Sequence, residues 1–154
     1  MENYLTFTVK ENPYAINVSS VLEVLNLSTP TSVPCALPYI EGLIYSRDQG
    51  ITVLNLRKRF NLEAHETDKR TKIIVVELKV PTEEAPDNIV LYGLVVDSVQ
   101  DVIQIYDEER IEDEKCAIPE EFIKCVLRYE DNPLFILDFE KLFEEHQGYA
   151  AANA

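Results

Sequence analysis

The feature that most constrains this chain is an internal repeat. The segment Tyr14–Leu25 aligns without gaps on Tyr92–Ile103 at an offset of 78 residues, and five of the twelve positions are identical. A second pair, Tyr39–Phe60 and Phe122–Phe143, follows in the same order at an offset of 83 residues. The change in offset falls in the connector between the blocks, where insertions cost little free energy. The chain therefore reads as one module written twice.

The 154 residues suffice for one domain, or for two small copies that share an interface. A half of about 70 residues would be marginal by itself, because small chains bury too little surface. We therefore expect a single domain over residues 1–147, with approximate repeats over 1–65 and 71–147 whose strands can interleave. Residues 148–154 are expected to form a flexible tail.

Alternation of apolar and polar residues predicts a mainly β fold. Tyr4–Val9 alternates strictly, and Tyr14–Val18 alternates again after a turn, which is typical of a hairpin. Residues 46–50 separate two further strands and are expected to form a five-residue hairpin loop. Many short strands with turn signals favour closed barrels, which remove exposed edges. We expect two small β-barrels packed side by side.

Three helices are predicted from the spacing of apolar residues. Two short ones, over 19–25 and 97–103, begin at serine or aspartate caps and continue with apolar residues at i, i+3 and i+4. The third begins near Phe139, presents one apolar face and is expected to end at Gly148.

Charge and apolar runs limit the possible partners. Twenty-eight acidic against fourteen basic residues give a net charge of −14, which disfavours nucleic acid and anionic membranes. The longest apolar run, Ile89–Val96, is too short to cross a bilayer. No basic leader precedes an apolar stretch, and Cys35, Cys116 and Cys125 have no disulfide or metal spacing. We expect a cytoplasmic protein with buried thiols and no membrane insertion.

No catalytic, metal or cofactor motif is found. His65 and His146 stand alone, and four glycines leave no phosphate-binding loop. The acidic run Asp107–Glu121 reads as a solvated segment, because a general acid needs a desolvated pocket. Surface recognition is the favoured function, and a small acid/base enzyme acting at the cleft between the barrels is the alternative.

Three residues of the first copy are candidates for that recognition. Glu23 is the single acid in an apolar segment and is expected to face away from the core. Gly42 interrupts a strand, which suggests the close approach of another backbone. Arg47 lies at a hairpin tip near the predicted position of Glu23, where the two side chains can form an ion pair.

At these residues the chain resembles the CheW family of chemotaxis coupling proteins, from Tyr4 to Phe143. The segments that carry the resemblance are Tyr4–Phe7, Tyr14–Val18, Val21–Val24, Tyr39–Arg47, Val53–Phe60, Gly93–Val102 and Ile136–Phe143. The ordered set is specific, although no single segment is.

The resemblance implies two SH3-like five-stranded barrels and a non-catalytic adaptor without cofactor or metal. The adaptor would join the cytoplasmic tips of methyl-accepting chemotaxis receptors to the regulatory domain of the histidine kinase CheA, in membrane-associated arrays. A coupling protein of another kinase pathway, such as twitching or gliding motility, is the alternative within the family. By matching positions, the receptor's helical hairpin would dock in the groove between the barrels, lined or supported by Val21, Glu23, Gly42, Arg47, Gly93 and Val102. The barrel ends would pair with the kinase.

Three places depart from the family pattern. Tyr45–Asp48 stands where the family usually reads Asn-Leu-Arg-Gly, so an aspartate replaces a glycine. Cys125 matches Gly42 in the second copy, and Lys79–Asn88 is longer and more acidic than usual. These departures bear on which receptors or which kinase the protein serves.

Overall fold

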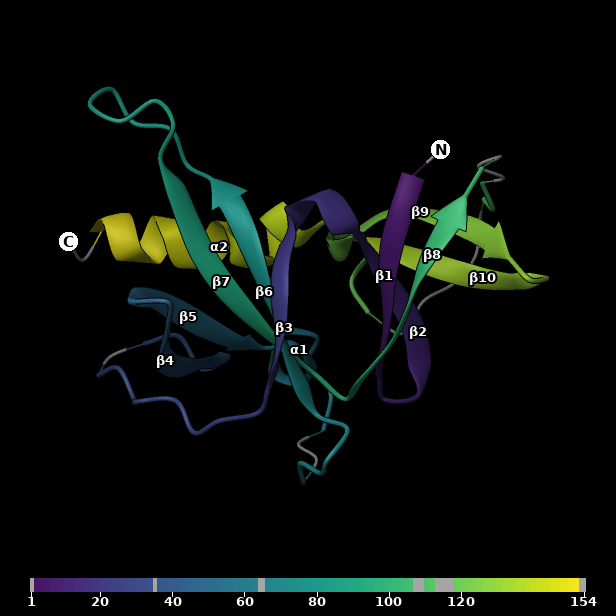
Figure 1. Cartoon of the computed structure of the whole chain (residues 1–154), viewed down its shortest axis with the longest axis horizontal. Coiled ribbons are helices and arrows are strands. Elements are labelled where there is room, and N and C mark those ends of the chain that lie inside the picture. Colours follow the sequence, from purple (N-terminus) through teal and green to yellow (C-terminus); the bar gives the residue numbers. More distant parts are fainter. Residues whose placement is uncertain (1, 35, 64–65, 107–109, 113–117, 153–154) are drawn as a thin grey trace. The chain divides into compact units, whose positions relative to one another are not determined.

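The computed structural model describes residues 2–34, 36–63, 66–106, 110–112 and 118–152. The chain divides into two compact units, each built around one five-stranded sheet (Figure 1). The first unit comprises Met1–Val18 and Gln100–Ala154, and the second comprises Ser19–Val99. The mainly β fold with two five-stranded sheets and a C-terminal helix is therefore confirmed.

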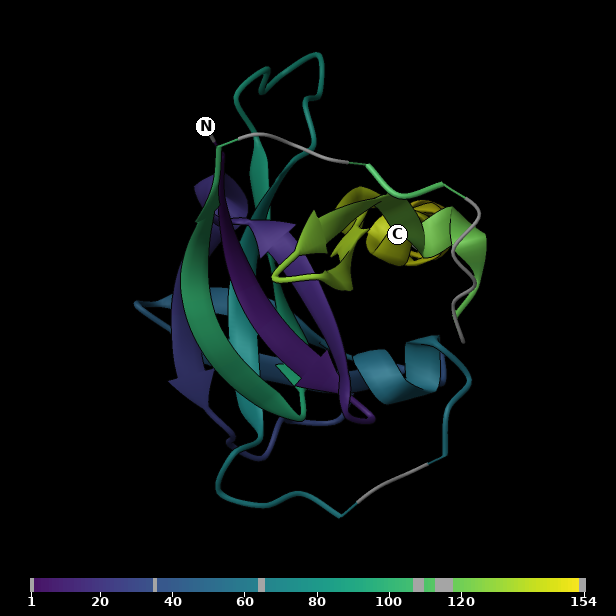
Figure 2. The same ribbon diagram turned by 90° about the vertical axis from the view of Figure 1, so that its right-hand side faces the viewer.

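In the first unit the strand order is β8-β1-β2-β10-β9. The long strands β1 and β8 lie side by side and twist together, as Figure 2 shows. The strands are β1 (Glu2–Val9), β2 (Asn12–Asn17), β8 (Ser98–Ile105), β9 (Ile123–Tyr129) and β10 (Asn132–Leu137). A short 3₁₀ helix, η2 (Glu120–Phe122), precedes β9, and helix α2 (Phe139–Ala152) follows β10.

In the second unit the strand order is β3-β6-β7-β5-β4. The strands are β3 (Val21–Asn26), β4 (Ile40–Ser46), β5 (Gln49–Asn55), β6 (Lys72–Lys79) and β7 (Ile89–Val96). A 3₁₀ turn, η1 (Val18–Ser20), precedes β3, and a single helical turn, α1 (Leu56–Arg59), follows β5. The connection between β6 and β7 is exposed and projects beyond the sheet (Figure 1), as expected from its polar sequence.

The two sheets interleave the two sequence copies. The repeat alignment places β2 and β3 on β7 and β8, and β4 and β5 on β9 and β10. The first sheet thus takes its β1–β2 hairpin from the first copy and its other three strands from the second copy. The second sheet does the reverse, with β6 and β7 from the second copy. The boundaries of the sequence repeats and of the compact units therefore differ.

In each unit a backbone bridge joins one outer strand of the sheet to the segment that follows the other outer strand. In the second unit, Thr31 lies just after β3 and pairs with Leu43 of β4, through two N–H···O hydrogen bonds of 2.8 and 2.9 Å. In the first unit, Arg110 lies after β8 and pairs with Leu127 of β9. Joining the outer strands in this way is how a small barrel removes its free edges.

Each unit has its own apolar cluster, formed by alternate residues of its strands. A fully buried side chain of this kind contributes about 1.5–3 kcal/mol to stability. The first cluster contains Tyr4, Ala15, Ile103, Ile105, Leu127, Leu134 and Ile136. The second contains Ile44, Ile51, Val53, Ile73, Val75, Leu91 and Val95.

The two short helices predicted over 19–25 and 97–103 are wrong, because these segments form the strands β3 and β8. In β3, half-buried and exposed residues alternate from Val21 to Asn26, which is the period of a strand. A six-residue segment with apolar residues on both faces satisfies helical spacing as well, so periodicity could not decide. The β-branched valines and the available partner strands β1 and β6 favour strands.

The five-residue hairpin loop predicted over 46–50 is also wrong. Strands β4 and β5 extend to Ser46 and Gln49, so only Arg47 and Asp48 form the turn. Their φ angles of 54° and 61° are left-handed, as a two-residue turn of type I′ requires. The hairpins at Lys10–Glu11 and Glu130–Asp131 have the same geometry without any glycine.

Helix α2 begins at Phe139 as predicted but does not end at Gly148, because it continues to Ala152. A glycine inside a helix costs only about 1 kcal/mol relative to alanine, which the flanking helix formers tolerate. Helix α1 was not predicted, since one turn is too short to show a helical period. Its first turn is capped by Asn55, whose side chain accepts a hydrogen bond from the backbone N–H of Lys58.

The left-handed turn gives a first testable prediction. Replacing Asp48 by glycine should raise the free energy of unfolding by about 0.5–1 kcal/mol, because glycine adopts positive φ without steric cost. Urea denaturation measures the change. The matched control is Gln49→Gly, one residue further in the extended strand β5, which should destabilise the protein. Equal destabilisation by both substitutions would contradict the turn assignment.

Candidate functional site

The ion pair expected between Glu23 and Arg47 is formed. Arg47 Nη2 lies 3.3 Å from Glu23 Oε2, and the Ser46 hydroxyl donates a hydrogen bond of 2.9 Å to Glu23 Oε1. Glu23 comes from β3, whereas Ser46 and Arg47 come from the end of β4 and its turn. The side chain of Arg47 is 69% exposed and that of Glu23 is 18% exposed. An ion pair so open to water contributes only about 0–1 kcal/mol, so its role in stability is small.

Three predicted site residues lie in one row across the second sheet. Glu23 of β3 pairs with Val75, Val75 with Gly93, Gly93 with Val53, and Val53 with Gly42. Directly opposed residues point to the same face of a sheet, so Glu23 shares its face with the buried valines. The expectation that Glu23 faces away from the core is therefore wrong. It lies at the margin of the second apolar cluster, where its carboxylate reaches the β4–β5 turn.

Gly42 allows the close approach of another backbone, as predicted. Its φ is +139°, and a Cβ atom there would lie 2.1 Å from the carbonyl oxygen of Thr31. The approaching backbone belongs to the same unit, at the bridge between Thr31 and Leu43. Gly42 is buried, so it contributes to the site by allowing this backbone approach and not by contacting a partner.

Gly93 is also a buried, structural position. A Cβ atom there would lie 2.8 Å from Ile73 Cγ2 and 3.4 Å from Ile51 Cγ2. The glycine therefore lets β7 pack beneath two isoleucines of the second apolar cluster.

The two predicted valines differ in exposure and in place. Val21 is half-buried at the start of β3, next to a bulge that separates it from Glu23. Val102 is 60% exposed on β8 and belongs to the first unit. The structure thus gathers Glu23, Gly42, Gly93 and Arg47 around one sheet, while Val102 is not part of that row.

Sequence reasoning missed Ser46 and the exposed apolar residues around the site. Leu22 and Val24 on β3 are 36% and 41% exposed, and Tyr45 on β4 is 74% exposed. The repeat contained a signal for one of them, because Val24 aligns at the offset of 78 with Val102, which is one of the candidate site residues. Reading β3 as a helix concealed the correspondence.

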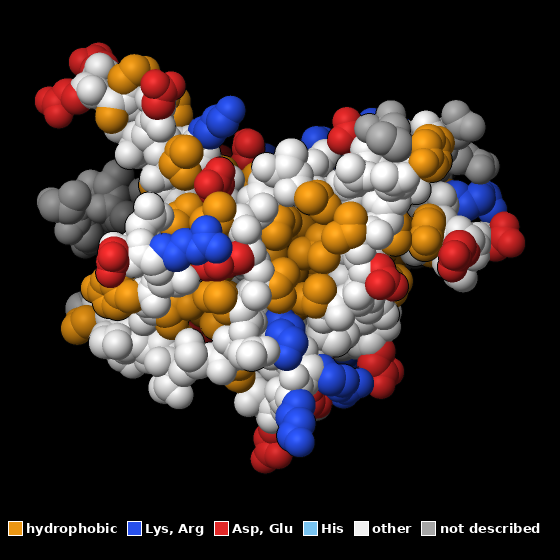
Figure 3. All heavy atoms as spheres, in the orientation of Figure 1, with side chains coloured by type: hydrophobic (Ala, Val, Ile, Leu, Met, Phe, Trp, Pro, Cys, Tyr) orange, Lys and Arg blue, Asp and Glu red, His pale blue; other side chains and the backbone are white. Residues whose placement is uncertain are grey.

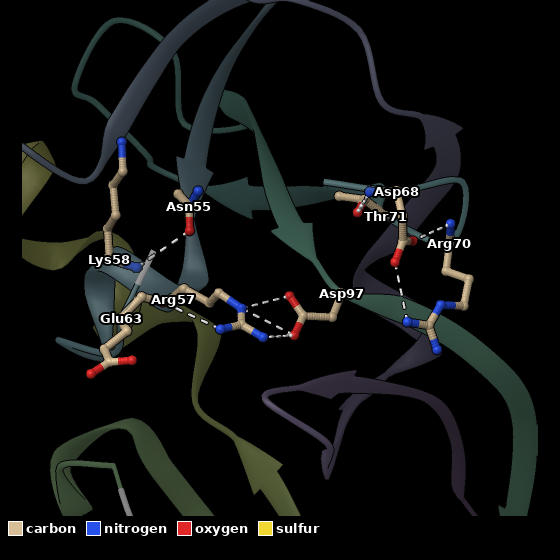
Figure 4. A network of polar contacts seen from close by, with 8 residues as sticks. All are labelled: Asn55, Arg57, Lys58, Glu63, Asp68, Arg70, Thr71 and Asp97. Atoms are coloured by element: carbon tan, nitrogen blue, oxygen red, sulfur yellow. Dashed lines mark hydrogen bonds and ion pairs between the residues drawn. The ribbon is translucent and has the colours of Figure 1, made fainter. Parts of the chain in front are cut away.

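A second polar network holds α1 in place (Figure 4). Arg57 donates to both carboxylate oxygens of Asp97 at 2.5–3.1 Å and to the carbonyl of Glu63 at 3.2 Å. Both charged side chains are mostly buried, at 15% and 22% exposure, and the hydrogen bonds from Arg57 to Asp97 raise the pKa of Arg57 above its ordinary value. The pair ties α1 to the end of β7.

The other two basic residues of α1 hold the start of β4. Lys58 Nζ lies 2.7 Å from Glu41 Oε1, and the guanidinium of Arg59 lies 4.5 Å from the ring centre of Tyr39. These contacts flank the bulge of β4 that contains Gly42. The β4–β5 hairpin that carries Arg47 is therefore anchored at its base.

The described residues contain no group of three His, Cys, Asp or Glu side chains that could hold a metal ion. Burial lowers the pKa of His146, which is half-buried on α2, whereas His65 lies outside the described residues. Cys125 is a half-buried thiol without a disulfide, and Cys35 and Cys116 also lie outside the described part. The run Asp107–Glu121 is described only in part. None of the described helices is long and apolar enough to span a membrane.

A comparison with models of protein families identifies the family of the chain. The family model for the CheW-like domain matches residues 3–147, nearly the whole chain. The chain belongs to the CheW-like domain family. The family resemblance inferred from the sequence is thereby confirmed.

Individual CheW proteins are similar over almost their full lengths. "Chemotaxis protein CheW" of Bacillus subtilis is 29% identical over 97% of this chain and 92% of its own. The protein of the same name from Thermotoga maritima is 27% identical over 92% of this chain and 87% of its own. The crystal structure of the scaffolding protein TtCheW from Thermoanaerobacter tengcongensis superposes with a TM-score of 0.78 at 28% identity, covering 93% and 92% of the two chains.

The close approach at Gly42 predicts a strong effect of substitution. Gly42→Ala should lower the free energy of unfolding by about 3 kcal/mol or more, because Cβ would collide with the backbone of Thr31. The matched control is Gly50→Ala, whose Cβ would meet only the Tyr45 ring, at 3.7 Å. Chemical denaturation of both variants checks this. Comparable stabilities would contradict the bridge between Thr31 and Leu43.

The network of Figure 4 offers a similar pair of variants. Arg57→Gln should destabilise the protein by about 2–3 kcal/mol, because a mostly buried Asp97 loses its charged partner. Arg70, which is 76% exposed beside Asp68, is the control, and Arg70→Gln should change stability little. The midpoints of urea unfolding measure both. Equal effects would show that the Arg57 pair contributes no more than a surface ion pair.

Proposed function

We propose that this chain is a non-catalytic adaptor that couples the cytoplasmic tips of methyl-accepting chemotaxis receptors to the regulatory domain of the histidine kinase CheA. In this role it is cytoplasmic and is recruited to membrane-associated receptor arrays. The observation that carries the proposal is the Glu23–Arg47 pair, at matching family positions, in a chain whose relatives are named chemotaxis proteins.

The distribution of polar groups supports docking over acid/base catalysis. Among the described residues, the buried polar side chains are Thr6 and Thr71, and neither is a carboxylate. A carboxylate that acts as general acid needs a desolvated pocket that raises its pKa. The described carboxylates are instead at least partly open to water, which suits surface contacts.

For the receptor we assign the predicted residues two kinds of role. Arg47 is 69% exposed and contacts the receptor, whereas Glu23, at 18% exposure, and Val21, which begins the same strand, line the edge of that surface and support it. Gly42 and Gly93 are buried and act by shaping the sheet beneath that surface. Val102, exposed on β8, is a further receptor contact.

For the kinase we assign the ends of the barrels, which pair with the similar regulatory domain of CheA. The net charge of −14 favours partner surfaces that carry basic groups. On the face shown in Figure 3, basic side chains occur singly or in small groups, most of them beside acidic ones. No broad basic patch is seen on that face that would suit a nucleic acid.

Binding assays with both partners test the proposal. The purified chain should bind receptor cytoplasmic fragments and CheA, and should join them in one complex that sediments with receptor-bearing membranes. Calorimetry with each partner separately gives the affinities. If the chain binds neither the receptor fragments nor CheA, the adaptor role is wrong.

Variants separate the two binding surfaces. Val102→Asp should weaken receptor binding about tenfold, since it places a charge in an apolar contact, while CheA binding stays within about twofold of the unmodified chain. Tyr106→Ser is the matched control, because Tyr106 is 69% exposed in the same unit and is assigned to no contact. A parallel loss of CheA binding, or an equal effect of Tyr106→Ser, would contradict the assignment of Val102.

A further inference from the structure

The two charged side chains of the Glu23–Arg47 pair differ in how many contacts they make within the chain. Both carboxylate oxygens of Glu23 have donors, since Oε1 accepts from Ser46 and Oε2 faces Arg47. The Glu23 side chain is only 18% exposed, so little of its charge is offered to a partner. The carboxylate of Glu23 thus already has hydrogen-bond donors within its own chain.

The guanidinium of Arg47 keeps most of its donors available. It carries five N–H groups, and the described contacts engage it only through Nη2, at 3.3 Å. Charge-assisted hydrogen bonds are usually about 2.7–2.9 Å long, so this contact is a weak one. Arg57 of the same unit is the opposite case, because its Nε and Nη2 both bind Asp97 and its side chain is 15% exposed.

The backbone fixes where this guanidinium lies. Arg47 has a φ of 54° in a two-residue turn whose flanking residues, Ser46 and Gln49, are paired in the sheet. The hairpin is anchored at its base through Lys58 and Glu41. Little conformational freedom of the backbone would be lost when a partner docks, which favours binding.

We propose that Arg47 binds a carboxylate of an aspartate or glutamate side chain on the docked receptor, and that Glu23 and Ser46 are positioning residues that orient its guanidinium. The proposal rests on the adaptor function given above and adds the chemistry of the partner at this position. The planar fork of arginine matches a carboxylate with two parallel hydrogen bonds, which a lysine cannot form. The Ser46 hydroxyl, which donates to Glu23 Oε1, leaves Glu23 Oε2 to face Arg47.

Calorimetry with a receptor cytoplasmic fragment tests the inference. Arg47→Met keeps the stem and removes the donors, and should weaken binding about tenfold, whereas Arg47→Lys should keep the charge and weaken binding about threefold. The control is Arg70→Met, because Arg70 is also exposed and beside a carboxylate of its own chain but belongs to no proposed surface. Urea unfolding of each variant checks that the fold is intact, as expected for so exposed a side chain.

A charge-reversal screen identifies the partner group. Arg47→Glu should abolish binding, and one receptor fragment among a panel in which each exposed acidic residue is replaced by arginine should restore it. Ser46→Ala should weaken binding about twofold, because Glu23 Oε1 then competes for the donors of Arg47. The affinity of Arg47→Glu for the unmodified fragment is the reference against which restored binding is measured.

The outcomes separate this inference from the adaptor function. If the unmodified chain binds the receptor fragment and Arg47→Met binds equally well, the inference is wrong and the adaptor function stands. If no acidic-to-arginine fragment restores binding to Arg47→Glu, the carboxylate partner is likewise excluded. If the unmodified chain binds no receptor fragment, the adaptor function fails and this inference fails with it.

Discussion

The candidate site depends on one backbone contact, the bridge between Thr31 and Leu43 above Gly42. Strands β3 and β4 are the outer strands of the second sheet. The two hydrogen bonds of this bridge join β4 to the segment that follows β3. Only a residue without a Cβ fits beneath the carbonyl of Thr31, so the bridge requires glycine at position 42. Because the bridge holds the two outer strands together, Glu23 on one reaches Ser46 and Arg47 at the end of the other. A structural glycine and a surface ion pair are thus parts of one arrangement.

The repeat explains why the two units are not equivalent as docking surfaces. Positions 23 and 47 of the first copy align with Asp101 and Glu130 of the second, so two acidic residues replace an acid and a base. The corresponding ion pair therefore cannot form in the first unit. Cys125 likewise takes the place of Gly42, and Cys125 does not share the positive φ of that glycine. The repeat gives the two units equivalent strands, and the residue differences at these few positions confine the Glu23–Arg47 arrangement to the second unit.

Much of the fold could be predicted from the sequence, because strand alternation and the repeat are long-range patterns. The close approach at Gly42 and the contact between Glu23 and Arg47 were also predictable, since a glycine in a strand and a charged hairpin tip have specific physical causes. Short segments were not predictable in the same way. Residues 21–25 carry apolar side chains that fit both a helix and a strand, and only the pairing with β6 decides. The turn at Arg47 and Asp48 lacks the Asn-Gly signal of type I′ turns, so its length could not be read from the sequence. Ser46 was missed because its role depends on a side chain 23 residues away.

The most direct test of the central claim is a nuclear magnetic resonance titration of the isotope-labelled chain with a receptor cytoplasmic fragment. If the receptor contacts the second unit at β3 and the β4–β5 turn, the largest shifts there should fall on Glu23, Ser46 and Arg47, including the side-chain Nε–H of Arg47. In the first unit, shifts should centre on Val102 of β8. Binding without shifts at β3 and the β4–β5 turn would contradict the claim that this ion pair marks the docking surface.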